Sequence, residues 1–371
     1  MNEQWMRRAI DLAERGRGRV SPNPVVGAVI VKDDQVIGEG WHEVIGQAHA
    51  ERQALRSCRV DPRGASMYVT LEPCNHTGRQ PPCTDAIIDS GISRVVVGSL
   101  DPNPKVTGQG IKRLRAAGIE VITGVLEQET DRQNEIFRHF IQHQTPFVAL
   151  KYAMSLDGKI AAHTGQSKWI TSDVARQHVH GLRNRYQAIL IGRGTALSDD
   201  PLLTCRIPGG RQPLRIICDS ELKTPLKSQL VQTSSVVPTV FVTARPLPRA
   251  RLYEAAGARV WVIGDESGQV DLARLIQRLG DEGMAAVLVE GGAAIHGAFL
   301  EAGLAQKVYA YIAPMLLGGA TAPSPIAGLG FDSPSKACHL SPPRITTLGP
   351  DILLESEVQS CLPESSKKSA Q

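Results

Sequence analysis

The chain has 371 residues, of which 42% are hydrophobic and 21% are charged, and it carries a net charge of +4 at neutral pH. This length exceeds the size at which one hydrophobic core usually stops growing, so we expect an ordinary globular protein with two domains. The small net charge and an aromatic content of 4% argue against a nucleic-acid partner, which requires basic surface and rings for base stacking.

The first residues of the chain are charged rather than apolar. Residues 3–14 place Trp5, Ala9 and Leu12 on one face with charges opposite, which is typical of an amphipathic helix and not of a secretory signal. No apolar run reaches the roughly 18 residues that a membrane span needs. We therefore expect a cytoplasmic protein without a membrane partner.

Helices and strands alternate after this first helix. A hairpin is predicted across Asp33-Asp34, between residues 25–32 and 35–40. The other elements are predicted helices at 49–57, 83–90, 109–117 and 127–143, and predicted strands at 67–70, 94–97 and 120–123. Strands separated by helices of this length indicate an α/β domain with a largely parallel sheet covered by helices.

A second alternating series follows Thr145-Pro146, where we place the domain boundary. Its predicted strands lie at 147–154, 188–191, 214–219, 239–243, 259–263, 286–290, 307–312 and 352–358, and its predicted helices at 172–185, 271–282 and 293–302. Thr171 or Ser172 is the expected N-cap of the first helix. We thus predict α/β domains at 1–145 and 146–360, and a disordered polar tail at 361–371.

His49-Ala50-Glu51, Pro73-Cys74 and Cys83 form the pattern that is richest in chemistry. Zinc-dependent nucleobase deaminases use such a set to activate water. Three protein ligands leave one position of a tetrahedral zinc ion open, as in a catalytic site. Zinc lowers the pKa of water bound there from about 15.7 to roughly 7. We therefore predict that His49, Cys74 and Cys83 bind Zn2+.

Glu51 lies two residues from a ligand and is free to carry protons. After water attacks the ring carbon that bears an exocyclic amine, one carboxylate can protonate the ring nitrogen and then the leaving amine. The alternative is a closed structural zinc site with a fourth protein ligand, for which His42 and His76 are the nearest candidates. The eight residues between the two cysteines also depart from the commoner C-x-x-C spacing.

Two glycine-rich segments follow predicted strands in the second half. Glu290-Gly291-Gly292 leads from an apolar strand into a helix, and Gly192-Arg193-Gly194-Thr195 follows another strand. Glycines permit close backbone approach, and N–H groups at a helix start suit a phosphate. Two such segments on one sheet favour a dinucleotide, although a full G-x-G-x-x-G is absent and such junctions are often mere tight turns.

Several runs resemble the bifunctional deaminase-reductases of riboflavin biosynthesis. In the first half these are Ser21-Pro22-Asn23-Pro24-Val25-Val26-Gly27, His49-Ala50-Glu51, residues 69–83 and Asp101-Pro102-Asn103-Pro104. In the second half they are residues 150–159, 167–171, 199–201 and 290–292. The resemblance extends to about Val358. The long spacer between the cysteines is typical of that family and not of tRNA-editing or cytidine deaminases.

The resemblance implies a cytidine deaminase-like three-layer domain that uses Zn2+ and a dihydrofolate reductase-like domain that uses NADPH. It implies hydrolytic deamination of 2,5-diamino-6-(5-phosphoribosylamino)pyrimidin-4-one, followed by reduction of the ribosylamino group to ribitylamino. The substrate is then a small phosphorylated pyrimidine, and a homo-oligomer is the expected assembly.

The resemblance also implies roles for individual residues. Candidates for holding the base, the ribose or the phosphate in the deaminase are Asn23, His42, His76 and Arg79, although each can instead satisfy its own loop. The implied cofactor contacts are Ala153, Trp169, Thr195, Asp199, Gly292, Ala293, Ala294, Ile295, His296, Gly297 and Ala298. The implied substrate contacts in the reductase are Ser167, Thr171, Arg183, Leu203, Arg206 and Glu290. Arg183 and Arg206 suit a sugar phosphate, because a guanidinium can bind two phosphate oxygens.

Reduction requires hydride transfer to C1 of the ring-opened imine, and Lys151, Asp199 and Glu290 are candidates for proton delivery or iminium stabilisation. Each of these residues can instead have a structural role. Lys151 can be a charge at the end of a strand, Asp199 an acidic residue of a turn, and Glu290 the ion-pair partner of a nearby basic residue. Two other functions remain open. One is a nucleic-acid-editing deaminase with an appended binding module, which predicts salt-sensitive binding. The other is a reductase whose metal site is only structural.

Overall fold

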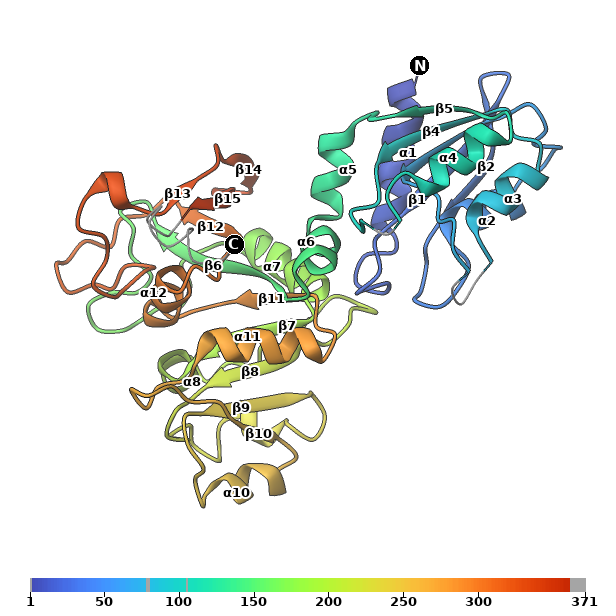
Figure 1. Cartoon of the computed structure of the whole chain (residues 1–371). Coiled ribbons are helices and arrows are strands. Elements are labelled where there is room, and N and C mark those ends of the chain that lie inside the picture. The colour runs from blue at the N-terminus through green and yellow to red at the C-terminus, as the bar shows by residue number, and fades with distance from the viewer. Residues whose placement is uncertain (1, 78–80, 105, 361–371) are drawn as a thin grey trace. The chain divides into compact units, whose positions relative to one another are not determined.

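The structure is a computed structural model, and it describes residues 2–77, 81–104 and 106–360. The chain divides into two compact units, Met1–Gln144 and Thr145–Gln371, and each is an α/β unit (Figure 1). The candidate Arg79 and the predicted tail at 361–371 lie outside the described residues. No helix within the described residues is long and apolar enough to cross a membrane.

The sheet of the N-terminal unit has five strands in the order β2-β1-β3-β4-β5. The strands are β1 Gly27–Lys32, β2 Gln35–Trp41, β3 Ser66–Leu71, β4 Arg94–Ser99 and β5 Glu120–Thr123. Strands β3, β4 and β5 are parallel, as predicted, but β1 pairs antiparallel with both of its neighbours. The expected hairpin between β1 and β2 is present.

Helices cover both faces of this sheet and make a three-layer unit. The helices are α1 Asn2–Glu14, α2 Ala50–Arg56, α3 Cys83–Asp89, α4 Gln109–Ala116, α5 Glu127–Gln133 and α6 Glu135–His143. Met6 and Leu12 of α1 pack with Val29, Tyr68 and Val96 on one face. On the other face, residues of α2, α3 and α4 pack with the alternate side chains of β1, β3 and β4. The fold predicted from the resemblance is thus confirmed for this unit.

The helix predicted over residues 127–143 is interrupted. It forms α5 and α6, which are separated at Asn134. The buried Asn134 side chain accepts a hydrogen bond from the Val25 N–H and donates one to the Val25 carbonyl, both at 2.9 Å. A long-range backbone contact therefore replaces the continuous helix that the local pattern favours.

The C-terminal unit contains a larger sheet in the order β10-β9-β8-β7-β11-β6-β12-β15-β13, with β14 paired to β15. Its first seven strands in that order are parallel, and β15 is antiparallel to β12. The strands are β6 Phe147–Ser155, β7 Ala188–Gly192, β8 Leu214–Cys218, β9 Thr239–Thr243, β10 Arg259–Val262, β11 Ala286–Val289, β12 Lys307–Ala313, β13 His339–Leu340, β14 Arg344–Leu348 and β15 Asp351–Ser360. Both faces of the central strands are buried, which explains their nearly continuous apolar sequences.

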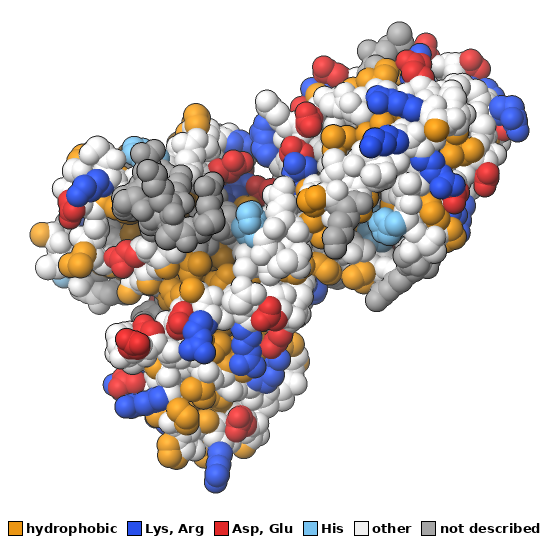
Figure 2. Space-filling model, in the orientation of Figure 1, with side chains coloured by type: hydrophobic (Ala, Val, Ile, Leu, Met, Phe, Trp, Pro, Cys, Tyr) orange, Lys and Arg blue, Asp and Glu red, His pale blue; other side chains and the backbone are white. Residues whose placement is uncertain are grey.

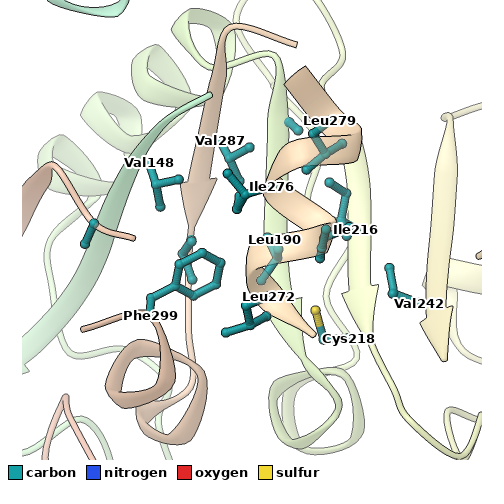
Figure 3. Packing of buried hydrophobic residues seen from close by; sticks show 14 of the residues in the cluster. Val148, Leu190, Ile216, Cys218, Val242, Leu272, Ile276, Leu279, Val287 and Phe299 are labelled. Carbon is teal, nitrogen blue, oxygen red and sulfur yellow. The ribbon is translucent and has the colours of Figure 1, made fainter. Parts of the chain in front are cut away.

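The helices of this unit lie on both faces of the sheet. They are α7 Asp173–Arg185, α8 Arg193–Asp199, α9 Gln229–Gln232, α10 Ala250–Ala255, α11 Leu272–Asp281 and α12 Ala293–Glu301, with a short 3-10 helix at Pro334–Lys336. Leu272, Ile276 and Leu279 of α11 point toward the strands and pack with Val287 and Ile216 (Figure 3). Ser172 is the N-cap of α7, and its hydroxyl accepts a hydrogen bond from the Ala175 N–H.

Sequence patterns missed six short elements among the described residues of this unit. They are α8, α9, α10, the 3-10 helix at Pro334–Lys336, β13 and β14. Helix α8 begins Arg-Gly, and its apolar residues are too few to give a helical period, so tertiary packing decides its form. On the face seen in Figure 2, Lys and Arg side chains of both units lie among Asp and Glu side chains.

Candidate active sites

Three candidate metal ligands meet in the N-terminal unit. Ligand atoms of His49, Cys74 and Cys83 all lie within 4.8 Å of one another. His49 Nδ1 is 3.5 Å from Cys74 Sγ and 3.4 Å from Cys83 Sγ. A tetrahedral zinc ion with ordinary Zn–N and Zn–S bonds separates such atoms by about 3.6 Å. The three side chains therefore fit one zinc ion, and this is the only such cluster among the described residues.

The ends of secondary-structure elements hold these ligands in place. His49 is the extended residue immediately before α2, Cys74 follows β3, and Cys83 is the first residue of α3. The Cys83 N–H lies 3.4 Å from Cys74 Sγ, and the Thr84 N–H donates to the Cys74 carbonyl. Hydrogen bonds from Cys83 lower the pKa of the Cys74 thiol to about 4, although burial opposes this, while the pKa of Cys83 is raised. These hydrogen bonds favour the thiolate form of Cys74, which is the form that binds metal.

The buried Glu72 anchors the segment that carries Cys74, and sequence reasoning did not single it out. Its carboxylate accepts N–H groups at the start of α4 and before it, from Asp101, Gly108, Gly110 and Ile111 at 2.9–3.4 Å. A Cβ at Gly110 would lie 2.1 Å from the Pro73 carbonyl oxygen, so the two segments are in close contact. No local signal in the sequence indicated this role, because the N–H groups that Glu72 accepts lie at least 29 residues away.

Glu51 lies inside the same site. It is 3% exposed and belongs to the first turn of α2, two residues after His49. Burial, reinforced by the nearby Cys74, raises the pKa of Glu51 to about 6. A carboxyl group with this pKa can both accept and donate a proton near neutral pH.

The other residues predicted for the deaminase site are partly gathered around the cluster. Asn23 Nδ2 lies 3.5 Å from His42 Nε2, and the His42 and His49 rings are 5.5 Å apart edge to face. His42 is 3% exposed, and its Nδ1 has no hydrogen-bond partner among the described residues. His76 is exposed, two residues after Cys74. Neither His42 nor His76 joins the three-residue metal cluster, so a closed structural site is not supported within the described residues.

One cavity of about 1450 Å³ in the C-terminal unit gathers the candidates of the second half. Its lining includes Lys151, Ala153, Ser167, Trp169, Thr171, Arg183, Thr195, Asp199, Leu203, Arg206, Glu290, Gly292, Ala293, Ala294, Ile295, His296 and Ala298. Of the predicted residues only Gly297 is outside the lining. A Cβ there would lie 1.7 Å from the Ala327 carbonyl oxygen, so Gly297 instead permits close packing of α12.

A buried charge cluster forms part of the cavity wall. Arg183 binds the Glu290 carboxylate with two hydrogen bonds, at 2.7 and 2.8 Å, and Lys151 Nζ is 3.9 Å from Glu290 Oε2. Burial alone would raise the pKa of Glu290, but Arg183 and Lys151 lower it to about 2. Burial lowers the pKa of Lys151, while Glu290 opposes this. The cluster thus carries two cations and one anion that face the same space.

The glycine segments and the candidates near them line the same cavity. Gly291 has φ +115, a conformation that favours glycine, and its carbonyl accepts the Gly192 N–H at 3.0 Å. Asp199 accepts a hydrogen bond from Ser167 Oγ at 3.3 Å. Trp169 is 71% exposed, and its ring lies 4.4 Å from the Arg176 guanidinium. The backbone at the carboxyl ends of β7 and β11 can therefore approach a nucleotide closely.

Comparison with known proteins identifies the family. The RibD C-terminal domain matches residues 146–354, and the cytidine and deoxycytidylate deaminase zinc-binding region matches residues 1–99. The riboflavin biosynthesis protein RibD of Actinobacillus pleuropneumoniae is 47% identical over 96% of this chain and 96% of its own. This chain belongs to the RibD family. RibD of Escherichia coli K12 is 40% identical over 95% of this chain and 98% of its own.

Solved RibD structures are similar over almost the whole chain. Acinetobacter baumannii RibD, form 1, has a TM-score of 0.84 and 36% identity, and covers 97% of this chain and 99% of its own. A diaminohydroxyphosphoribosylaminopyrimidine deaminase/5-amino-6-(5-phosphoribosylamino)uracil reductase from Thermotoga maritima has a TM-score of 0.82 and 39% identity, with 96% and 99% coverage.

Membership of the RibD family defines the activities of the chain. It is a bifunctional enzyme of riboflavin biosynthesis, with a zinc-dependent deaminase unit and an NADPH-dependent reductase unit. The family, the fold class and the two cofactors predicted from sequence are confirmed. The nucleic-acid-editing alternative is not supported.

Proposed function

We propose that the N-terminal unit deaminates 2,5-diamino-6-(5-phosphoribosylamino)pyrimidin-4-one and that the C-terminal unit reduces the resulting uracil to its ribitylamino form. The observation that carries this proposal is the presence of two chemically different sites in one chain. One site combines three zinc ligands with a buried carboxyl, and the other is a cavity lined by glycine turns and a buried charge cluster. The related enzyme of Thermotoga maritima is named for the same two activities.

In the first step, His49, Cys74 and Cys83 would hold zinc, which would supply an activated water. Glu51 accepts a proton from that water and delivers it to the ring nitrogen beside the carbon under attack. It then takes up the proton of the newly added hydroxyl group and delivers it to the exocyclic amine, which leaves as ammonia when the C–N bond breaks, so that one water is consumed for each amine lost. The pKa of Glu51 of about 6 supports this double role. Asn23, His42 and His76 orient the pyrimidine, and Arg79 binds its phosphate.

In the second step, NADPH bound in the cavity of the C-terminal unit would supply the hydride that reduces C1 of the ring-opened ribosylamino group. Glu290 fixes Arg183 and Lys151 in the cavity, with Arg183 bound by both carboxylate oxygens. Lys151 is the proton donor, because burial lowers its pKa and brings proton release closer to neutral pH. Asp199 and Ser167 orient the substrate together. Arg183 and Arg206 bind the sugar phosphate, and Thr171, Ser167 and Leu203 contact the substrate.

The glycine segments and the residues near them would hold the cofactor. Ala153, Trp169, Thr195 and Asp199 would contact it, together with the lining residues at and after the N-cap of α12, which are Gly292, Ala293, Ala294, Ile295, His296 and Ala298. The N–H groups at the start of this nine-residue helix suit the pyrophosphate. Gly297 supports this arrangement through close packing rather than through contact with the cofactor.

We further propose a cytoplasmic homo-oligomer that acts on a small phosphorylated pyrimidine and not on nucleic acid. Apolar side chains at the edge of the second sheet support self-association. Ile345 on β14 is 65% exposed and Ile352 on β15 is 42% exposed. Light scattering of the purified chain measures the assembly, and a monomer at all concentrations would contradict it.

The proposed order, deamination before reduction, can be tested directly. The purified chain is incubated with the diamino pyrimidine, with and without NADPH and a zinc chelator. We expect ammonia release without NADPH, NADPH oxidation only after deamination, and neither in the presence of the chelator. NADPH oxidation in the chelated sample, with no ammonia released, would contradict the proposed order.

A further inference from the structure

The charge on Lys151 is only partly compensated within the buried charge cluster of the cavity. Arg183 already binds both oxygens of the Glu290 carboxylate, and Lys151 Nζ is 3.9 Å from one of them. The side chain of Lys151 is 16% exposed, so water solvates its charge poorly. Burial without a full counter-charge disfavours the ammonium form of a lysine. A lysine that must hold a proton for the reduction therefore needs a further contact that favours its charged form.

Tyr311 supplies such a contact from the neighbouring strand. β12 runs parallel to β6, and the register pairs Tyr311 with Ala153. Lys151 lies two residues before Ala153 and on the same face of the sheet, so Tyr311 is its diagonal neighbour. Lys151 Nζ lies over the Tyr311 ring, 5.7 Å from its centre, and both residues line the cavity. A cation at this distance over the face of an aromatic ring is attracted to it.

His178 holds the Tyr311 ring in this position. Its Nδ1 lies 2.8 Å from the Tyr311 hydroxyl, and it belongs to α7, the helix that also carries Arg183. Burial raises the pKa of Tyr311, so the hydroxyl keeps its proton and donates the hydrogen bond. Burial lowers the pKa of His178, although Glu355 opposes this, which favours a neutral ring that accepts. Since Tyr311 is fully buried, this hydrogen bond and close packing fix its ring.

Other ionisable side chains also face Lys151. Burial lowers the pKa of Lys151, Glu290 after β11 opposes this, and Arg183 on α7 adds to it. His296 on α12 is buried and interacts with the charge of Lys151, but burial lowers the pKa of His296 and favours its neutral form. Glu290 and the Tyr311 ring are thus contacts that favour the ammonium form of Lys151, and they reach it from different strands.

We propose that Tyr311 is a positioning residue of the reductase, whose ring, anchored by His178, keeps Lys151 protonated and in place to donate its proton. The inference rests on the proposed function, in which Lys151 is the proton donor. The ring attracts the ammonium and not the neutral amine, so it acts on the protonation of Lys151 as well as on its position. Loss of the ring should therefore lower the pKa of Lys151.

The pH profile of kcat tests this role. The full-length chain reduces supplied 5-amino-6-(5-phosphoribosylamino)uracil with saturating NADPH, and the rate falls on the alkaline side as Lys151 loses its proton. We expect Tyr311→Leu to move this alkaline limb to lower pH by roughly one unit, because the attraction to the ring is lost. Tyr311→Phe keeps the ring, so its alkaline limb should stay near that of the wild type.

A fluorinated ring removes the attraction while the core stays filled. Fluorine withdraws negative charge from the ring face, so Tyr311→3,4,5-trifluorophenylalanine should shift the alkaline limb in the same direction as Tyr311→Leu. The same replacement at Tyr309 is the matched control, because that ring lies on the same strand and faces Lys307 at 5.2 Å. It should leave the alkaline limb unchanged. Dissociation constants for NADPH, measured by nicotinamide fluorescence, show whether each variant keeps an intact cavity.

Variants of His178 test the anchor separately. His178→Ala removes the acceptor of the Tyr311 hydroxyl and should lower kcat several-fold, whereas His178→Gln keeps an acceptor oxygen and should restore most of the rate.

An alkaline limb that stays in place in both Tyr311→Leu and Tyr311→3,4,5-trifluorophenylalanine would overturn the inference. A kcat that falls equally at every pH would do the same, because it would indicate a merely structural role. Failure of the wild-type chain to reduce the supplied uracil, or an unchanged alkaline limb in Lys151→Met, would instead contradict the proposed function of the cavity.

Discussion

Glu51 is the residue on which the proposed deamination depends. It is almost completely buried beside the zinc ligands, but it is not one of the three residues of the cluster. Its pKa of about 6 distinguishes it from an ordinary surface glutamate. Since general acid/base catalysis contributes about 10²–10⁴-fold, loss of its proton-carrying capacity should be visible in the rate of ammonia release.

We expect Glu51→Gln to lower the deamination rate by about 10²–10⁴-fold and to leave one zinc ion per chain. The amide keeps the shape of the side chain but cannot take up the proton from water. Ammonia release and metal content measured on the same preparation check this. Glu127→Gln, at an exposed position in the same unit, is the control. Full activity of the Glu51 variant would remove this residue from the mechanism.

Glu290 makes the stability of the reductase unit depend on pH. Its pKa in the folded chain is about 2, below its ordinary value of 4.5. The Glu290 carboxylate therefore takes up a proton less readily in the folded state than in the unfolded state. Its contribution to the free energy of unfolding is complete above pH 4.5 and is lost as the pH falls toward about 2. A pKa shift of this size corresponds to a contribution of roughly 3 kcal/mol at most to the free energy of unfolding.

We expect Glu290→Gln to lower the free energy of unfolding of the reductase unit at pH 7. The difference from wild type should shrink as the pH falls from about 4.5 toward 2, because the wild-type carboxylate is then protonated. Urea unfolding followed by fluorescence at several pH values measures this. A difference that stays constant over that range would show that Glu290 does not titrate as a partner of Arg183 and Lys151.

At the scale of elements, Glu72 joins β3 to the start of α4 and so positions Cys74. In Glu72→Gln the amide nitrogen cannot accept the N–H groups that one carboxylate oxygen now accepts. We expect zinc to be released to a competing chelator roughly tenfold more readily, as for other residues that support metal ligands. Glu127→Gln is the matched control, because Glu127 is an exposed acid in the first turn of α5. Unchanged zinc affinity in Glu72→Gln would show that the anchor does not support the metal site.

Arg215 connects the strands of the second sheet to the segments around them. The side chain is fully buried on β8 and donates to Thr239 Oγ1, to Thr233 Oγ1 and to the carbonyls of Leu202, Leu230 and Val237. Replacement by methionine leaves these buried oxygen atoms without donors. A single missing donor already costs about 1–3 kcal/mol.

We therefore expect Arg215→Met to lower the free energy of unfolding of the reductase unit by about 3 kcal/mol or more. Zinc binding should not change. Urea unfolding followed by fluorescence and a zinc assay on the same sample measure the two effects. The control Arg251→Ala, at an exposed position, should change stability by less than about 0.5 kcal/mol. If Arg215→Met were as stable as the wild type, the buried oxygen atoms that Arg215 contacts would have to find other hydrogen-bond donors.

At the scale of the whole molecule, the sequence was most informative where a pattern is local. The spacing of His49, Cys74 and Cys83 predicted a metal cluster, and the structure brings these three residues together. The short apolar segments that alternate with helical segments predicted most of the strands. What it missed depends on long-range contacts. Asn134 ends α5 because it binds the backbone of Val25, and Glu72 finds its partners more than 28 residues away. Neither partner is visible in the local sequence.

The roles proposed for the reductase residues illustrate the same limit. Of the reductase residues that the family resemblance implied, all but Gly297 line the cavity. However, the ion pairs of Glu290 with Arg183 and Lys151 join β6, α7 and the end of β11. No spacing rule connects such distant positions. The charge state of the cavity could therefore be derived only from the folded chain.

Mixing two single-site variants tests the central claim, that one chain carries two separate sites acting in sequence. The Glu51→Gln chain should leave the diamino pyrimidine unchanged but reduce 5-amino-6-(5-phosphoribosylamino)uracil with NADPH at the wild-type rate. The Glu290→Gln chain should release ammonia and stop at that uracil. A mixture of the two should form the ribitylamino product. Failure of the Glu51 variant to reduce the supplied uracil, or of the mixture to complete both steps, would contradict the account.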